Sequence, residues 1–197
     1  MPDRSAEISR ETKETKIRLA LNLDGSGKCA ARTGVGFFDH MLDLLARHAL
    51  LDLSIHADGD LDVDAHHTVE DVGIVLGQAI EKAVGDKRGI FRYGWAIVPM
   101  DESLAQVAID LSGRPAFVFN APFRGAMIGA FPAELVEEFF KSVATNAKCN
   151  LHVNVPYGTN NHHVAEAIFK ATAKALRQAI SLDPRAGDQV PSTKGLL

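Results

Sequence analysis

The stretch Ala65-His66-His67-Thr68-Val69-Glu70-Asp71 occurs a second time near the C-terminus, as Asn161-His162-His163-Val164-Ala165-Glu166-Ala167. Each copy reads His-His-x-x-Glu at the start of a helical-looking run, and the interval between them is 162 − 66 = 96 residues. On a helix the glutamate follows the two histidines by four and three residues, so each histidine shares a helix face with it. The repeat therefore predicts two helices that begin with the same polar side chains.

The side chains of this repeated motif are of the kind that bind transition metals. Adjacent histidines on a helix diverge by about 100°, so they serve two ions more easily than one. Neutral imidazole with carboxylate, and without thiolate, suits manganese, iron or zinc. For a single copy, the alternative is a polar helix start in which the helix dipole favours a glutamate. Two copies in matching contexts favour the metal interpretation.

The amino-acid composition and net charge indicate a globular protein of ordinary type. The chain has 197 residues, of which 46% are hydrophobic and 23% charged, as is typical of a soluble globular domain with a core of ordinary size. The net charge of −4 gives no support for a surface that binds nucleic acid. No apolar run has the length of a signal peptide or a membrane span, and we interpret the two cysteines as packed free thiols. We expect a cytoplasmic protein that contacts neither nucleic acid nor membrane.

The order of the predicted elements also occurs twice. Alternation and helical spacing predict a strand hairpin, a helix, a strand and the motif helix in the first half, at residues 16–31, 37–48, 51–56 and 66–84. In the second half the same signals predict strands, a helix, a strand and the motif helix, at residues 95–98, 105–111, 116–119, 134–147, 151–155 and 162–180. His56 and His152 are also 96 residues apart, and we interpret them as core histidines. The sequence predicts an α+β fold made by internal duplication, with pseudo-twofold symmetry and sheet packed on helices.

The duplication divides the chain into three expected units. Residues 1–90 form the first half-repeat and residues 91–185 the second, each with one copy of the motif. Residues 186–197 form a short polar tail, which is typical of a flap or of a frayed chain end.

Further ligands are needed because two motifs do not fill the coordination of two ions. His40 stands at the start of the helix that precedes the first motif. Glu138 falls opposite His40 when the corresponding helix of the second half is aligned with a shift of two residues. A carboxylate there could bind metal; the alternative is a solvated surface glutamate.

Basic residues at turns suggest a phosphate group on the substrate. Arg92, Arg114 and Lys194 lie at predicted turns or in the tail, and Lys170 follows His162 by eight residues, about two turns along nearly the same helix face. Arginine and lysine converging near a metal pair would bind phosphate. Taken singly, each of them is better explained as a solvated surface charge.

Longer stretches of the chain resemble the imidazoleglycerol-phosphate dehydratase family of histidine biosynthesis. The matching stretches are Gly36-Phe37-Phe38-Asp39-His40-Met41-Leu42, Asp64 to Asp71, Asp110-Leu111-Ser112-Gly113-Arg114-Pro115, Asn161 to Ala167, and Pro191-Ser192-Thr193-Lys194-Gly195. The resemblance spans residues from about 7 to 195. It implies a hydro-lyase that converts imidazole glycerol phosphate to imidazole acetol phosphate, with two manganese ions per site. It also implies a duplicated fold like domain 2 of ribosomal protein S5, and a homo-oligomer of twenty-four subunits with sites at subunit interfaces.

The resemblance also assigns roles to individual residues. It implies eight metal ligands: His40, His66, His67, Glu70, Glu138, His162, His163 and Glu166. Family members often have histidine where this chain has Glu138, so that ligand departs from the pattern. The resemblance makes Glu14 the acid/base carboxylate, whereas the sequence alone favours an exposed glutamate at a strand entry. It implies five contacts to substrate and phosphate: Arg92, Arg114, Lys170, Ser192 and Lys194.

Two other classes of function suit parts of the pattern. A structural or storage protein could use ions to cross-link subunits, and closed metal coordination would be its signature. A metal-dependent phosphohydrolase would also combine two ions with basic residues. The basic residues argue against storage, and an assay that separates ketone from free phosphate would distinguish the two enzymes.

Overall fold

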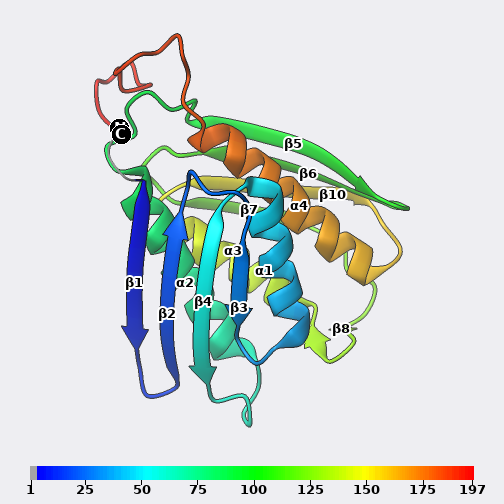
Figure 1. Ribbon diagram of the computed structural model, residues 1–197. Coiled ribbons are helices and arrows are strands. Elements are labelled where there is room, and N and C mark those ends of the chain that lie inside the picture. The colour runs from blue at the N-terminus through cyan, green and yellow to red at the C-terminus, as the bar shows by residue number, and fades with distance from the viewer. Residues whose placement is uncertain (1–3) are drawn as a thin grey trace.

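The computed structural model describes residues 4–197 and contains two four-stranded mixed sheets with helices between them (Figure 1). The first half provides β1 (Ser5–Glu11), β2 (Thr15–Asn22), β3 (Cys29–Arg32), α1 (Gly36–Ala49), β4 (Asp52–Gly59) and α2 (His66–Val84). The second half provides β5 (Tyr93–Met100), β6 (Ser103–Asp110), β7 (Ala116–Asn120), α3 (Glu134–Asn146), β10 (Asn150–Tyr157) and α4 (Asn161–Ile180). A short hairpin that we did not predict, β8 (Met127–Ile128) with β9 (Phe131–Pro132), precedes α3.

The two sheets have the same topology. Their strand orders are β1-β2-β4-β3 and β5-β6-β10-β7, and in each sheet only the last pair is parallel. The helices repeat this correspondence, because α2 packs on β1 and β2 while α4 packs on β5 and β6. The predicted duplicated α+β fold is confirmed.

Strand register corrects one detail of the predicted repeat. His56 pairs with Arg18, the fourth residue of β2, whereas Asn154 pairs with Gln106, the fourth residue of β6. The counterpart of His56 is therefore Asn154, at an offset of 154 − 56 = 98, and not His152. The interpretation of His56 and His152 as core histidines is wrong, since both side chains are exposed on the outer faces of the sheets.

The core lies between the sheets and is rich in aromatic side chains. Each strand of the first sheet presents alternate apolar residues to the helices, as the predicted alternation requires. At the centre, the ring of Phe139 lies 5.2 Å from that of Phe38 on α1 and 5.4 Å from that of Phe169 on α4. Phe139 and its neighbours thus join helices from both halves into one core.

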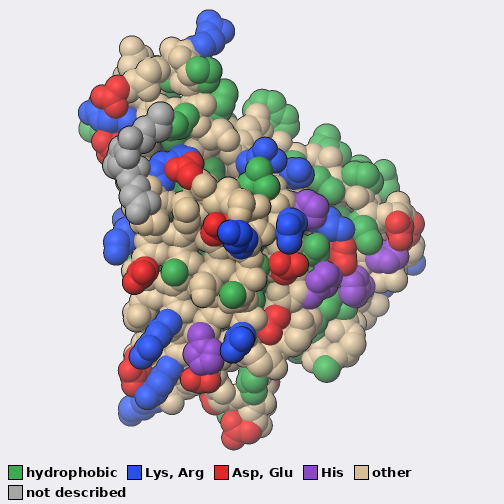
Figure 2. Space-filling model, in the orientation of Figure 1, with side chains coloured by type: hydrophobic (Ala, Val, Ile, Leu, Met, Phe, Trp, Pro, Cys, Tyr) green, Lys and Arg blue, Asp and Glu red, His purple; other side chains and the backbone are tan. Residues whose placement is uncertain are grey.

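The outer faces of the two sheets differ in polarity. In the second sheet Trp95, Ala108, His152 and Val118 form one row by register, and Trp95 is 64% exposed. The corresponding row of the first sheet has small or polar side chains: Glu7, Ala20, Ser54 and Ala30. Figure 2 shows hydrophobic side chains gathered along β5. Among residues 4–197, no helix combines the length and apolar character that a membrane span requires.

Candidate metal centre

Helices α1 and α4 bring three of the predicted ligands together. His40 Nε2 lies 3.2 Å from Glu166 Oε1, and His162 Nε2 lies 3.1 Å from the same oxygen. One ligand atom from each of the three residues lies within 4.8 Å of the others. Asn160 fixes the start of α4, because its side-chain oxygen accepts the backbone N–H groups of His162 and His163. Within the described part of the chain, this is the one group of three such ligand atoms found so close together.

The donor set of this cluster fits a divalent transition metal. Two imidazoles and one carboxylate, without thiolate, suit manganese, iron or zinc. The carboxylate is prepared for such a role, since Glu166 accepts a hydrogen bond of 2.6 Å from Lys170. Burial by itself would raise the Glu166 pKa, but hydrogen bonds from Lys170 and the histidines outweigh it and lower the pKa to about 2. Glu166 is therefore ionised at neutral pH, as metal binding requires.

The second histidine of this copy has a carboxylate partner of its own. Nδ1 of His163 lies 2.7 Å from Oε2 of Glu102, in the turn between β5 and β6. The other oxygen of Glu102 accepts the backbone N–H groups of Thr159 and Asn160, at 3.1 and 2.8 Å. The hydrogen bond with Glu102 raises the pKa of His163, and the bonds from His163 and Asn160 lower that of Glu102.

The first copy of the motif has a similar arrangement around His67. Nδ1 of His67 lies 3.0 Å from Asp60, which follows β4, and 3.9 Å from Glu14, which precedes β2. The hydrogen bond with Asp60 raises the pKa of His67. The rings of His66 and His67 are 6.1 Å apart and almost perpendicular, at 86°, so the two side chains diverge as helix geometry predicts.

The first copy does not form a compact cluster like that around Glu166. Glu138 is the fifth residue of α3, as His40 is of α1, so the predicted correspondence between them is present in the structure. Its carboxylate lies 3.3 Å from Lys141 on the same helix. Helix α3 packs against α2, so Glu138 lies on the helix pair that carries His66 and Glu70.

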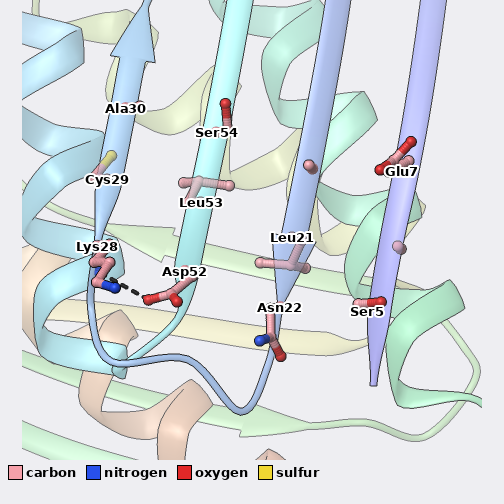
Figure 3. Close-up of a pocket in the computed structure, with 12 residues that line it drawn as sticks. Ser5, Glu7, Leu21, Asn22, Lys28, Cys29, Ala30, Asp52, Leu53 and Ser54 are labelled. Atoms are coloured by element: carbon pink, nitrogen blue, oxygen red, sulfur yellow. Dashed lines mark hydrogen bonds between the residues drawn. The ribbon is translucent and has the colours of Figure 1, made fainter. Parts of the chain in front are cut away.

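The starts of the two motif helices border the same hollow. Ala65 at the start of α2 and His162 on α4 line a depression of about 530 Å³, together with Phe37 and residues of the β8–β9 hairpin. Another hollow, of about 390 Å³, lies on the outer face of the first sheet (Figure 3). There the backbone N–H of Lys28 donates to Asp52 at 3.0 Å, and the lining residues include no histidine. This second hollow is not part of the metal centre.

Three of the five predicted phosphate contacts lie at the opposite end of α4. Arg92 donates to both oxygens of Asp110, at 2.7 and 3.1 Å, and to the carbonyl of Pro191 in the tail at 2.8 Å. Its backbone N–H donates to Ala179 near the end of α4. Helix α4 has 20 residues and is therefore about 30 Å long. Arg92 and the tail residues Ser192 and Lys194 thus lie far from His162 in the same chain, whereas Lys170 lies beside the metal cluster.

Two functional candidates, Asp60 and Glu102, were missed in the sequence. Asp60 is one of four aspartates at alternate positions between residues 58 and 64, so nothing in the local pattern distinguishes it. Glu102 had a usable signal, because 102 − 14 = 88 is also the offset between the starts of β2 and β6, at Thr15 and Ser103. Alignment of the two halves by strands would have found it.

Comparisons with known proteins identify the family to which this chain belongs. The sequence model of the imidazoleglycerol-phosphate dehydratase family matches residues 33–176. The imidazoleglycerol-phosphate dehydratase of Azorhizobium caulinodans is 61% identical over 194 residues, which cover 98% of each chain. That of Albidiferax ferrireducens is 57% identical over 197 residues, covering 100% of this chain and 97% of the relative. The chain belongs to the imidazoleglycerol-phosphate dehydratase family.

Solved structures of the family share the fold. The crystal structure of imidazoleglycerol-phosphate dehydratase from Staphylococcus aureus matches with a TM-score of 0.83 and 41% identity, covering 91% of this chain and 99% of that one. The enzyme from Pyrococcus furiosus, in complex with (S)-C348, matches with a TM-score of 0.82 and 34% identity, covering 96% and 100%. The family predicted from the motifs is confirmed.

Proposed function

We propose that this chain dehydrates imidazole glycerol phosphate to imidazole acetol phosphate in histidine biosynthesis, using two manganese ions per site. The observation that carries the proposal is the cluster of His40, His162 and Glu166 in a chain that belongs to the dehydratase family. The two diverging histidines of each motif support two ions rather than one.

The proposed metal ligands are the two motifs with one residue from each preceding helix: His40, His66, His67, Glu70, Glu138, His162, His163 and Glu166. When bound, the ions supply Lewis-acid polarisation and a template for the substrate. The residues of the chain fix the imidazole rings and keep Glu166 ionised. Glu138 supplies a carboxylate at the position that His40 occupies in the other half.

Glu14 is the proposed acid/base residue. Its side chain is 53% exposed, and its carboxylate is 3.9 Å from His67, so it is close to a proposed ligand without belonging to the cluster of three. The reaction removes a proton from a carbon without an adjacent carbonyl, and a positioned carboxylate that is not ligating metal can accept it.

The proposed phosphate contacts are Arg92, Arg114, Lys170, Ser192 and Lys194. The end of the chain that holds Arg92 and the tail is about one length of α4 from His162. A small substrate cannot span that length within one chain, so Arg92, Ser192 and Lys194 of one subunit serve the metal centre of another. The exposed apolar row at Trp95 and Val118 supports association of subunits, and we propose an assembly of twenty-four.

The test is to incubate the manganese-loaded protein with imidazole glycerol phosphate and to measure ketone and free phosphate in parallel. We expect ketone without phosphate. Release of phosphate would identify a hydrolase instead, and release of neither product would leave a metal-binding structural protein.

A further inference from the structure

We propose that Asp60 and Glu102 are positioning residues with the same task in the two halves of the chain. Each carboxylate accepts the Nδ1–H of the second histidine of its motif, His67 or His163, and so leaves the lone pair of Nε2 to bind metal; Asp101, at 3.7 Å from Nε2 of His163, is beyond hydrogen-bond distance. The inference rests on the proposed function, because it takes these two histidines as metal ligands. It names two residues that act through the ligands and do not themselves contact the ion.

Both histidines are held at the same ring atom. Nδ1 of His67 lies 3.0 Å from one oxygen of Asp60 and 3.2 Å from the other. Nδ1 of His163 lies 2.7 Å from Glu102. A carboxylate cannot donate, so each contact requires the proton on Nδ1 and leaves the lone pair of a neutral ring on Nε2. A partner of this kind fixes both the tautomer and the orientation of a metal-binding histidine.

The two carboxylates, Asp60 and Glu102, stand at positions of the repeat that are not equivalent. Gly59 and Gly158 are counterparts, because a Cβ on either would lie within 4 Å of corresponding neighbours: Thr15 and Thr68 for the first glycine, Ser103 and Val164 for the second. The residue after the glycine is Asp60 in the first half and Thr159 in the second. The counterpart of Glu102 in the first half is Glu14, each being the residue before β2 or β6.

The replacement of Asp60 by Thr159 in the second half explains why Glu14 and Glu102 have different contacts with their histidines. In the second half Thr159 has no charge, and its backbone N–H donates to Glu102, which also accepts from Asn160. Glu102 is thereby held beside His163. In the first half Asp60 takes the histidine, and Glu14 remains at 3.9 Å from it. Asp60 thus frees Glu14 for proton transfer, while Glu102 is committed to orienting its histidine.

Replacing each carboxylate with its amide should affect His163 and His67 differently, and this difference tests the proposal. In Glu102→Gln the single carbonyl oxygen stays with the two backbone N–H groups, which can only donate. The amide nitrogen then faces Nδ1 of His163, so Nδ1 must accept and the proton moves to Nε2, the atom needed by the metal. In Asp60→Asn the side chain can turn its oxygen to His67, whereas Asp60→Ala removes the acceptor.

The experiment combines two measurements on the full-length chain stripped of metal. Titration with Mn²⁺ alone should show that Glu102→Gln and Asp60→Ala bind roughly 10- to 100-fold more weakly than wild type, and that Asp60→Asn stays close to wild type. Nitrogen-15 NMR of labelled histidines should show the Nδ1–H tautomer of His163 in wild type and the Nε2–H tautomer in Glu102→Gln. Asp62→Asn, an exposed neighbour in the same loop, serves as the matched control.

Unchanged Mn²⁺ affinity and an unchanged tautomer in Glu102→Gln would overturn the inference. A fall in Mn²⁺ affinity for Asp60→Asn as large as that for Asp60→Ala would also count against it, because the charge and not the acceptor would then matter. Failure of the wild-type protein to bind Mn²⁺ would instead contradict the ligands of the proposed function. The tautomer comparison would still decide whether Glu102 orients His163.

Discussion

At the scale of single residues, the two halves have different side chains at equivalent positions where the motif helix packs on the sheet. Asp71 on α2 is buried and accepts hydrogen bonds from Arg10 at 2.8 Å and from Thr15 at 2.5 Å. The offset of 96 between the motif helices places Ala167 at the corresponding position of α4, and the strand offset of 88 places Val98 opposite Arg10. An ion pair in one half therefore corresponds to two apolar side chains in the other, which is consistent with the small net stability of buried ion pairs.

Removing one partner of that ion pair should nevertheless destabilise the fold. Asp71→Asn keeps the size of the side chain but leaves the guanidinium of Arg10 without a charged partner. Because Arg10 is 36% exposed and partly compensated by water, we expect the free energy of unfolding to fall by about 1–3 kcal/mol. Urea denaturation of the metal-free protein measures this, with Asp62→Asn as the control. Equal urea midpoints for the two variants would contradict the prediction.

Substitution of Glu14 tests the proposed proton transfer directly. Glu14→Gln keeps the shape of the side chain but removes the base, so turnover should fall by roughly 10²- to 10⁴-fold. Manganese content and substrate binding should stay near wild type, because the residue is not among the proposed ligands. Steady-state kinetics with metal analysis separate these effects. Near-normal turnover in a fully metallated variant would remove Glu14 from the mechanism.

At the scale of elements, the sequence best predicted the helices and strands that are long enough to show a periodic pattern. The motif helices and the repeated order of elements followed from spacing alone, and the structure contains them. The β8–β9 hairpin was missed because its strands have two residues each, too short to show alternation. The segment between the glycine at the end of the strand and the motif is three residues shorter in the second half, from Gly158 to His162, than in the first half, from Gly59 to His66, so the interval of 96 between the motifs misaligned His56. Asp60 and Glu102 contact histidines that are 7 and 61 residues away in the sequence, outside the motif, and the spacing within the motif does not report such contacts.

One close contact between elements can be tested directly. A Cβ on Gly94 of β5 would lie 1.9 Å from the carbonyl oxygen of Ala175, so α4 packs on the sheet through this glycine. Gly94→Ala should therefore force α4 away and lower the free energy of unfolding by about 1–3 kcal/mol. Gly36→Ala at the start of α1 is the control, since its Cβ meets nothing within 4 Å. Thermal or urea unfolding should show the loss in the first variant only; an equally stable Gly94→Ala would show that the contact relaxes freely.

At the scale of the whole molecule, the candidate residues lie at separate places. His40, His162 and Glu166 meet at the start of α4, while Arg92 and the tail meet at its far end. Glu14 stands at the start of β2, and the other end of that strand adjoins Arg4, which donates to Ile180 at the end of α4. A strand of eight residues is about 26 Å long, so Glu14 is also remote from Arg92 and the tail. The proposed site, which combines these residues, would therefore require more than one copy of the chain.

Mixed assemblies can test this sharing of residues between subunits. Glu14→Gln and Lys194→Ala are each expected to be impaired, the first in turnover and the second in binding a phosphate-bearing substrate. If Glu14 and Lys194 of one site come from different subunits, co-assembly of the two variants creates some sites with both native residues. Turnover at low substrate concentration should then exceed that of either variant alone.

The matched control mixes Arg114→Ala with Lys194→Ala, two residues that are proposed to contact the same phosphate; in the chain, Gly113 next to Arg114 lies close to the C-terminal residue Leu197. That mixture should not recover, since every phosphate site lacks one contact. Recovery in the control, or none in the test mixture despite verified co-assembly, would mean that the site is divided between subunits in another way.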